Sequence, residues 1–500
     1  MTIASFDGIQ PKQGMLTKAV HQIPVWLWFG AGLFALSVIG GNRALQDADT
    51  YWQIVIGQSI IDHHAFPFFD TFSFTKTGAP WMSSSWLAQV LYALAYGLAG
   101  WAGPVILASL AIGGTFALLL HILSRRFTMM HATIVTMMAV LLSSYHFHAR
   151  PHVLALPVML AWVYGLISAS DEGKAPSLWL LPLIVLWANL HGGFILGLAL
   201  IGPFALDALW NADAKKRKRL TVRWAAFGVA ALVASWITPY GWNSLLAARS
   251  ILDLGGALAM IPEWQPADFS SLDILEICLL GVLALVLTRG VVLSPPRILL
   301  ALGFLHMALS HNRNWEVLAL LAPLVVAKPL AAQFPKAAVA RVTSSQPWLA
   351  SAIFVAALGA ATWAFVANHQ FSPVVSQTPA AAIDVLKNQK AQRIFHSPGF
   401  GGYMIWTGIP TFIDGRAELY GEKFVVDTLN AIALKNVDLF LSLLQTYRID
   451  ATLLTPQAPA VSLLDHLDGW QRIYADDLAV VHVRKAGALS AGEKIRPASQ

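Results

Sequence analysis

The sequence carries little charge for its length. Only 12% of the 500 residues are Asp, Glu, Lys or Arg, whereas 56% are hydrophobic. Soluble domains hold about 25% charged residues, so the composition excludes an ordinary soluble protein and predicts a membrane protein. The single cysteine, Cys278, excludes intrachain disulfides and zinc sites built on paired cysteines. No P-loop, GxSxG or HExxH motif occurs, so the enzyme classes that these motifs mark are not indicated.

Hydrophobic runs long enough to cross a membrane are abundant instead. A spanning helix needs about 20 apolar residues, and the 19 tryptophans suit anchoring at headgroup level. The first run begins at Ile23 without an A-x-A cleavage site nearby, so it predicts a retained helix rather than a removed signal peptide. We expect about eleven transmembrane helices, at 23–41, 103–124, 130–146, 151–169, 177–190, 193–210, 224–238, 272–289, 296–310, 315–330 and 347–367.

Basic residues lie in clusters between the hydrophobic runs. Short cytoplasmic loops of membrane proteins collect Lys and Arg, so these clusters predict the cytoplasmic face rather than a nucleic-acid surface. They agree with a cytoplasmic N-terminus at 1–22 only if the apolar segment 86–101 does not fully cross. We therefore interpret 86–101 as an interfacial or re-entrant helix. The clusters are Arg125–Arg126, Lys215–Arg219, and Lys328 with Lys336 and Arg341.

This topology divides the chain into a membrane domain and an external tail. Residues 23–367 would form a transmembrane domain with a long external first loop at 42–102. The tail has ordinary soluble composition, and its alternating helix and strand patterns predict a small α/β domain at 368–487. That domain would include a helix capped by Thr378 and a strand at "TFIDG". The last residues, 488–500, are predicted to be disordered.

Two aspartates follow the first predicted helix in the stretch "DADTYWQ". Asp47 or Asp49 could act as a general base toward an acceptor hydroxyl, or could bind Mg²⁺ or Mn²⁺, which prefer oxygen ligands. The alternative is a helix N-cap, since the pair directly precedes an apolar segment. Both roles are compatible if one aspartate caps the helix and the other is free. From the residues alone, the cap is the favoured interpretation.

The external turn "HFHARPH" gathers His146, His148, Arg150 and His152. Arginine offers a rigid donor fork that suits phosphate, and basic residues have no topological reason to gather on the external face. Zinc binding by the histidines is conceivable, but no companion cluster has zinc-ligand spacing. The alternative is a polar turn at the boundary between membrane and water.

Further polar residues of unusual type lie in the other external segments. One belongs to "NLHGG", for which a tight turn between helices is an equally good interpretation. Three belong to the tail, where an internal Asp–Arg pair that stabilises a turn is the simpler account. These candidates are His191 in "NLHGG", Arg313 in "SHNRN", Glu263 in "PEW", and Asp414, Arg416 and Glu418 in "FIDGRAELYG".

These motifs resemble the GT-C superfamily of membrane glycosyltransferases, in particular the bacterial branch that uses polyprenyl-phosphate sugars. The resemblance rests on the acidic "DAD" after the first helix, followed by "TYWQIVIGQSIIDHH", "PFFDTFSFT" and "PWMSSSWLAQ". It continues through "ARPH", "WANLHGG", "TPYG" and "PEW" into "SPGFGGYMIWTGIPTFIDGRAELYG", and so covers almost the whole chain. It implies a polytopic α-helical core with juxtamembrane helices in the first loop, a region that 86–101 would complete.

The resemblance also implies a reaction and its participants. The donor would be a polyprenyl-phosphate-linked sugar held among membrane lipids of the bacterial inner membrane, and the acceptor a periplasmic glycan, lipid or protein. Asp49 would be the general base, with Asp47 as the other candidate. The family's second site, after the third crossing, is often acidic, but the corresponding stretch "HFHARPH" contains no carboxylate. A metal-independent site is therefore implied, and Mg²⁺ or Mn²⁺ on Asp49 is the alternative. The donor phosphate would be bound by Arg150, His148, His152, His191 and Arg313, and the acceptor-side candidates are Glu263, Asp414, Arg416 and Glu418.

Two other classes of function stay open at this point. The chain could be a non-catalytic GT-C-like scaffold in envelope polysaccharide assembly or export. It could also be a transporter, although no inverted repeat is apparent. An enzyme predicts that Asp49, Arg150 and Arg313 converge on one external, lipid-open cavity, whereas a scaffold does not require this.

Overall fold

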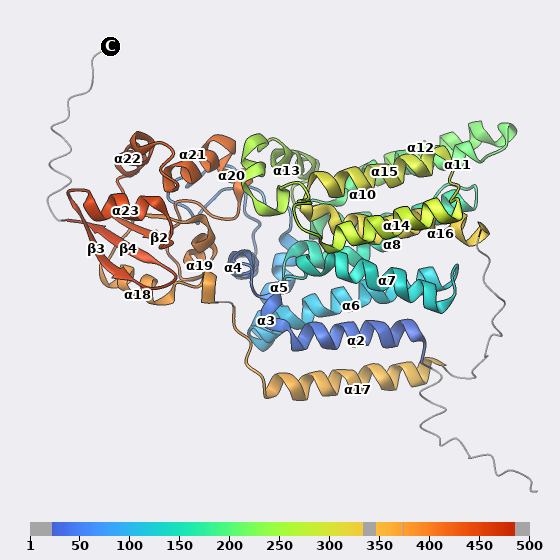
Figure 1. The fold of residues 1–500 in the computed structure, drawn as a ribbon, viewed down its shortest axis with the longest axis horizontal. Helices are drawn as coiled ribbons and strands as arrows, with labels where there is room; N and C mark the ends of the chain where they lie inside the picture. Colours follow the sequence, from blue (N-terminus) through green and yellow to red (C-terminus); the bar gives the residue numbers. More distant parts are fainter. Residues whose placement is uncertain (1–22, 334–346, 374, 486–500) are drawn as a thin grey trace, which may run out of the picture.

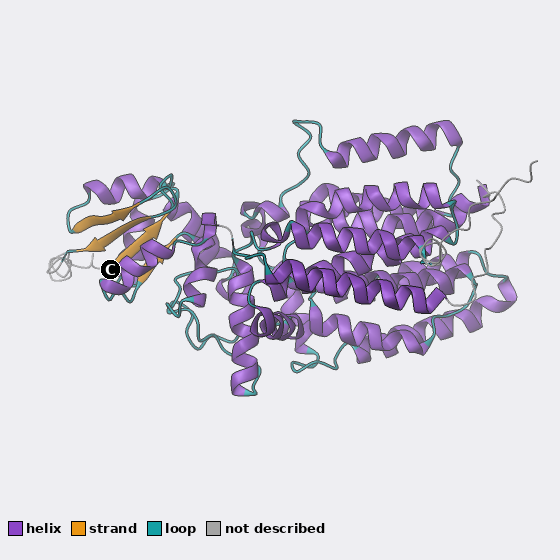
Figure 2. Cartoon of the chain, turned by 90° about the horizontal axis from the view of Figure 1, so that it is seen from below, coloured by secondary structure: helices purple, strands orange, loops and turns teal. Residues whose placement is uncertain are grey.

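The structure is a computed structural model that describes residues 23–333, 347–373 and 375–485. Within these residues, long helices form a bundle, and a four-stranded sheet belongs to a smaller domain beside one end of it (Figures 1 and 2). The predicted cytoplasmic segment 1–22, the predicted disordered tail 488–500, and the basic residues Lys336 and Arg341 lie outside the described residues.

The bundle consists of largely apolar helices whose starts are set by local signals. The Thr128 hydroxyl accepts a hydrogen bond from the His131 N–H, and the Asp273 carboxylate accepts one from the Glu276 N–H. Pro151 occupies the first position of its helix, where its missing N–H costs nothing. The bundle helices are α2 (Val25–Ile39), α6 (Ala102–Ser124), α7 (Met129–Ser143), α8 (Pro151–Asp171), α9 (Leu181–Leu190), α10 (Phe194–Ala199), α11 (Ile201–Trp210), α12 (Ala214–Ala234), α14 (Ile274–Arg289), α15 (Pro295–Ser310), α16 (Trp315–Gln333) and α17 (Pro347–Ala367).

Membrane character follows from the length and composition of these helices. Several apolar helices, among them Val25–Ile39 and Pro295–Ser310, have only 10–17 residues and are short for a complete span. The predicted number of about eleven spans is therefore not established. In the described part of the chain, four helices are long and apolar enough to cross a membrane, namely Ala102–Ser124, Pro151–Asp171, Asn312–Gln333 and Trp348–Ala367.

Helices α2 and α6 pack closely and antiparallel. A Cβ added at Gly30 would lie 2.6 Å from the Cβ of Ala117, near the end of α6. A Cβ added at Gly41, just after α2, would lie 2.6 Å from Cγ1 of Val105, near the start of α6. Small residues permit such close approach of two helices. The end of α2 and the start of α6 therefore lie at the same end of the bundle, as Figure 1 shows.

The segment between α2 and α6 leaves the bundle and returns to it at that end. It contains α3 (Gly41–Ala44), α4 (Asp49–His63) and α5 (Trp86–Ala99). Gly57 of α4 lies against the backbone of Gln89 in α5, and Gly103 of α6 lies against the carbonyl of Ala95. Because α5 packs on α4 and on the start of α6, the arrangement agrees with our interpretation that 86–101 does not carry the chain across.

Short helical segments supply most of the remaining connections. Several of them, η1, α13, η3, η4 and η5, lie at the same end of the bundle as α4. The segments are η1 (Ser144–His146), η2 (Leu178–Leu180), α13 (Asn243–Leu252), η3 (Gly255–Met260), η4 (Pro262–Trp264), η5 (Asn312–Asn314), η6 (Val375–Gln377) and η7 (Pro398–Phe400).

The C-terminal domain is the predicted small α/β unit. Its strands are β1 (Ile394–His396), β2 (Ala451–Leu454), β3 (Trp470–Ala475) and β4 (Val480–Arg484), in the order β1-β2-β4-β3. Strands β1 and β2 are parallel, and the other two pairings are antiparallel. The helices of the domain are α18 (Ala380–Asn388), α19 (Gly401–Trp406), α20 (Ala417–Tyr420), α21 (Glu422–Ile432), α22 (Val437–Thr446) and α23 (Pro459–His466).

Two local predictions for this domain are wrong. Helix α18 begins after Pro379 without a side-chain cap, and the Thr378 hydroxyl instead lies 2.7 Å from the Tyr51 hydroxyl. The predicted strand at "TFIDG" forms only an isolated bridge with Ser73. Its Thr411 N–H donates to the carbonyl of Phe72 in the first loop, so this backbone ties two parts of the chain together rather than extending the sheet.

Candidate functional site

Asp47 and Asp49 lie where the first loop turns into helix α4. The N-cap position belongs to Ala48, and no side chain caps this helix. Asp47 accepts a hydrogen bond of 2.8 Å from the Asp49 N–H, so it supports the turn that starts the helix. The Asp49 side chain accepts a 2.8 Å hydrogen bond from Nε1 of Trp52 and otherwise faces away from the helix backbone. Asp49 is therefore not a cap, and its second carboxylate oxygen is available to another partner.

That partner is Arg150, which binds three carboxylates at once. Its guanidinium pairs with Asp49, with Glu263, and with Asp47 at 3.2 Å. Arg150 directly precedes Pro151, which favours an extended backbone at this residue. Its carbonyl accepts a 3.0 Å hydrogen bond from the Tyr92 hydroxyl. Four separate segments of the chain therefore meet at this arginine.

The three carboxylates differ in how their environment acts on them. Burial raises the pKa of Asp49 to about 6, and the charge of Asp47 adds to the rise, although Arg150 opposes it. Burial also acts to raise the pKa of Glu263, but Arg150 and Arg313 together hold it below its usual range. At neutral pH, Glu263 is thus firmly ionised, whereas Asp49 exchanges its proton near pH 6.

The histidines of the turn lie beside this arginine as neutral groups. Burial lowers the pKa of His146 to about 4 and that of His191 to about 3, with Arg313 and Arg150 adding to the effect at His191. Burial and Arg150 likewise lower the pKa of His148. Neither ring nitrogen of the buried His146 has a hydrogen-bond partner among the described residues. These rings can therefore offer hydrogen bonds to a ligand, but they do not carry positive charge at pH 7.

Glu316 is a further carboxylate near these histidines, and the sequence analysis did not identify it. It is 8% exposed, its Oε2 atom finds no hydrogen bond within the described chain, and that atom lies 3.9 Å from Nε2 of His152. The His152 ring in turn lies 6.3 Å from the ring of His191. An acidic residue in the first turn of an apolar run was the available signal, because such residues usually face a cavity or a functional group.

Arg313 approaches the same region from the turn before α16. Its guanidinium stacks over the ring of Trp264 at 4.2 Å, next to Glu263. The carbonyl of Trp264 lies 2.7 Å from Nδ1 of His311, which fixes the two turns against each other. The structure therefore brings Asp49, Arg150 and Arg313 to one end of the bundle through Glu263 and its neighbours.

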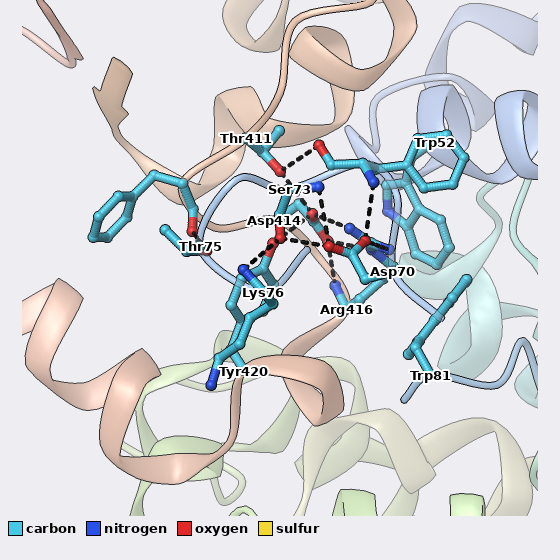
Figure 3. A network of polar contacts seen from close by, with 12 residues as sticks. Trp52, Asp70, Ser73, Thr75, Lys76, Trp81, Thr411, Asp414, Arg416 and Tyr420 are labelled. Carbon is cyan, nitrogen blue, oxygen red and sulfur yellow. Dashed lines mark hydrogen bonds and ion pairs between the residues drawn. The ribbon is translucent and has the colours of Figure 1, made fainter. Parts of the chain in front are cut away.

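The tail candidates form a different, buried network, which Figure 3 shows from close by. Arg416 is fully buried and pairs with Asp70 at 2.6 Å and with Asp414 at 2.7 Å. Asp414 also accepts hydrogen bonds from Thr411 and from Tyr420, at 2.9 and 2.7 Å. Because their polar atoms are used internally, Asp414 and Arg416 fit the structural account better than a role toward an acceptor.

Glu418 completes the attachment of the C-terminal domain to the first loop. It accepts a 3.0 Å hydrogen bond from Nε1 of Trp81, and burial raises its pKa. The ring of Trp81 lies 4.8 Å from the Arg416 guanidinium. Asp70, from the first loop, is the partner of Arg416 that sequence reasoning missed. No local pattern links residues that are 346 positions apart.

This network also holds a loop directly over Asp49. Gly415 lies between Asp414 and Arg416, and a Cβ at this position would overlap Oδ1 of Asp49. The same Cβ would lie 2.9 Å from Nε1 of Trp52. The C-terminal domain therefore covers the carboxylate that Arg150 orients.

No three His, Cys, Asp or Glu side chains in the described residues are arranged to hold a metal ion. The carboxylates of Asp47, Asp49 and Glu263 instead pair with the guanidinium of Arg150.

No protein-family model and no curated protein matches this sequence. Among solved structures, the fold is similar to the archaeal oligosaccharyltransferase AglB from Archaeoglobus fulgidus in complex with an inhibitory peptide and a dolichol-phosphate. That match has a TM-score of 0.52 and 12% identity, and covers 86% of this chain and 69% of that chain. The Archaeoglobus fulgidus oligosaccharyltransferase in the apo form matches with a TM-score of 0.48 and 11% identity, over 85% of this chain and 69% of that chain.

AglB is a membrane glycosyltransferase of the GT-C superfamily, so the chain has a GT-C-like fold. The resemblance that the sequence motifs predicted is thereby confirmed. At 12% identity the likeness concerns the fold alone.

Proposed function

We propose that the protein is a membrane glycosyltransferase that moves a sugar from a polyprenyl-phosphate donor to an acceptor hydroxyl. The observation that carries the proposal is the meeting of Asp49, Arg150 and Glu263 at one end of the bundle, with Arg313 stacked beside them. A partly buried acid near neutral pKa and two arginines are what transfer from a phosphate leaving group needs. The dolichol-phosphate in the AglB complex supports a lipid-linked donor.

Asp49 acts as the general base. With a pKa of about 6, it is mostly ionised at pH 7 and yet a stronger base than an ordinary carboxylate. As the acceptor oxygen attacks the anomeric carbon of the sugar, Asp49 takes the hydroxyl proton. The bond from that carbon to the phosphate oxygen breaks, and polyprenyl phosphate leaves with the bonding electrons. Attack opposite to the leaving group inverts the anomeric centre.

Arg313 is the cation best suited to the leaving phosphate. Arg150 is already engaged with Asp47, Asp49 and Glu263, whereas Arg313 forms no ion pair with any described carboxylate. Arg150 orients the base, and the neutral His148 and His191 donate hydrogen bonds to the phosphate oxygens. Glu263 lies on the acceptor side, where its negative charge interacts with both Arg150 and Arg313.

We also propose that the reaction needs no divalent cation. A Mg²⁺ or Mn²⁺ ion would use carboxylate oxygens as ligands. In this site the guanidinium of Arg150 already bridges Asp47, Asp49 and Glu263.

The site would face the periplasm of the bacterial inner membrane, where a glycan, lipid or protein supplies the hydroxyl. The basic positions Arg125, Arg126 and Lys328 lie at the opposite end of α6 and α16 from Asp49, and the α11–α12 connection before Lys215 lies at that end too (Figure 1). The positive-inside rule assigns that end to the cytoplasm.

The test is a comparison of two aspartates on helix α4. Asp62 is exposed and bonds only to Gln58 one turn away, so Asp62→Asn is a matched control for Asp49→Asn. We expect Asp49→Asn to lower kcat for transfer from a polyprenyl-phosphate sugar by about 10²–10⁴-fold, the usual contribution of a general base. Asp62→Asn should keep the wild-type rate.

Both variants are checked for insertion and melting temperature before the assay. Full transfer by folded Asp49→Asn would remove Asp49 from the mechanism. A scaffold predicts a different result, in which neither the wild type nor either variant transfers sugar.

A further inference from the structure

A second polar pocket lies at the opposite end of the bundle from Asp49, and the proposed reaction does not use it. Its volume is about 200 Å³, and it lies between the final turns of α6 and α8 and the last third of α16. Three cationic side chains line it, Arg125, Arg126 and Lys328, together with one carboxylate, Asp171. In the sequence, these basic residues indicate only the cytoplasmic face.

The carboxylate at this pocket is paired with a buried arginine. Arg297 pairs directly with Asp171 and, through Nε, with Asp207 at 2.9 Å. Asp207 is further bound by the hydroxyls of Ser170 and Ser294, at 2.7 and 2.8 Å. Arg297 therefore serves both buried acids, and the one negative charge that remains on the pair is shared by the cations at the pocket rim.

The two rim cations that pair with Asp171 are largely exposed and lie at long ion-pair distances from it. Arg126 lies 3.6 Å from Asp171 and its side chain is 47% exposed. Lys328 lies 3.7 Å from the same carboxylate and is 44% exposed, with its ammonium also bonded to the Asp171 carbonyl. Counting Arg125 and Arg297, four cations face two carboxylates, which leaves an excess of two positive charges at the pocket.

The inner wall of the pocket is apolar, unlike its rim. It is formed by Ile122, Ile167 and Leu324, with the ring of Tyr164 beside them. All of these belong to helices that are long enough to span the membrane, and Ile122 and Ile167 lie close to the ends of α6 and α8, where headgroups lie. A free anion would gain nothing from this wall, whereas a lipid would place its phosphate at the rim and its first methylenes against the wall.

We propose that this pocket binds the phosphate of an anionic membrane lipid from the cytoplasmic leaflet. The bound phosphate bridges Arg126 and Lys328, with Arg125 at the outer edge. It thereby joins the ends of α6, α8 and α16, three of the helices that support the site at the other end. This proposal does not depend on the glycosyl-transfer reaction.

The test measures lipid binding by the purified full chain in neutral detergent. Phosphatidylglycerol, phosphatidylcholine and inorganic phosphate are titrated separately, and the melting temperature is followed. We expect phosphatidylglycerol to raise the melting temperature and the other two probes to leave it unchanged. In Arg126→Gln/Lys328→Gln, the Kd for phosphatidylglycerol should rise about 30-fold, since each basic side chain near an anionic lipid contributes about fivefold.

The matched control is Lys215→Gln/Lys218→Gln, which removes two exposed positive charges from the start of α12 and leaves the pocket intact. Its Kd should stay within about twofold of wild type. Equal weakening in both double variants, or equal stabilisation by phosphatidylcholine or inorganic phosphate, overturns the proposal. If the pocket double variant does not fold, Arg125→Gln replaces it, because Arg125 bonds only to His121. Unchanged affinity in folded Arg125→Gln also overturns the proposal.

Discussion

Replacing Gly415 with alanine should displace the proposed base without removing any charged group. The added Cβ would overlap Oδ1 of Asp49 and lie 2.9 Å from Nε1 of Trp52. The Trp52 Nε1–H group donates the hydrogen bond that holds this oxygen in place. Gly415 is not among the glycines with positive φ, so alanine strains no backbone angle there, and the effect comes from the overlap alone. Relief of the overlap needs a shift of about 1 Å, and misplacement by that distance lowers reaction rates about 100-fold.

The matched control is Gly399→Ala in the same domain. A Cβ at Gly399 meets no atom within 4 Å, and this glycine also lacks a positive φ. The assay compares kcat for transfer from a polyprenyl-phosphate sugar, with melting curves to show that each variant is folded. We expect Gly399→Ala to keep the wild-type kcat while Gly415→Ala loses about 100-fold. Wild-type kcat in folded Gly415→Ala would refute the idea that the C-terminal domain positions Asp49.

Three further predictions concern charge. Because burial raises the pKa of Asp49 to about 6, its base form is lost as the pH falls through 6, so kcat/KM should rise with pH to a plateau above about pH 7. A half-maximum of kcat/KM near pH 4 would contradict this. Arg416→Met leaves Asp70 and Asp414 buried without a cation, so the free energy of unfolding should fall by about 3–5 kcal/mol in denaturant titrations. The control Arg472→Gln removes an exposed ion pair and should lower it by at most about 1 kcal/mol. EDTA should leave kcat unchanged, and a loss that Mg²⁺ or Mn²⁺ restores would show that a cation takes part.

Features that depend on local sequence were predictable. Long apolar runs define the bundle, because a membrane demands about 20 apolar residues per crossing. The position of Arg125–Arg126 decided that 86–101 stays at one end, and the antiparallel packing of α2 on α6 agrees with this. The alternating helix and strand patterns over 368–487 predicted the α/β class of the C-terminal domain.

The pairings that build the site could not be predicted, because they join residues far apart in sequence. Arg150 and Glu263 are 113 positions apart, and they meet only because the turns before α8 and after η3 pack at the same end. The stretch "HFHARPH" contains no carboxylate, and its Arg150 pairs with Glu263 from another loop.

Burial was the other property hidden from the sequence. The histidines of "HFHARPH" suggested positive charge toward a phosphate, yet His146 and His148 are buried beside Arg150 and stay neutral at pH 7. Asp414 and Arg416 were candidates for the acceptor side, and their full enclosure with Asp70 and Tyr420 favours the structural role instead.

The most direct test of glycosyl transfer is a mass balance on the donor. Purified wild-type protein is incubated with a panel of labelled polyprenyl-phosphate hexoses and pentoses and with acceptor-containing membranes. We expect that one donor is consumed with time and that polyprenyl phosphate appears in equal amount. The label should move to an acceptor with inverted anomeric configuration. Folded wild-type protein that consumes no donor in the panel, or that yields a retained configuration, would contradict it.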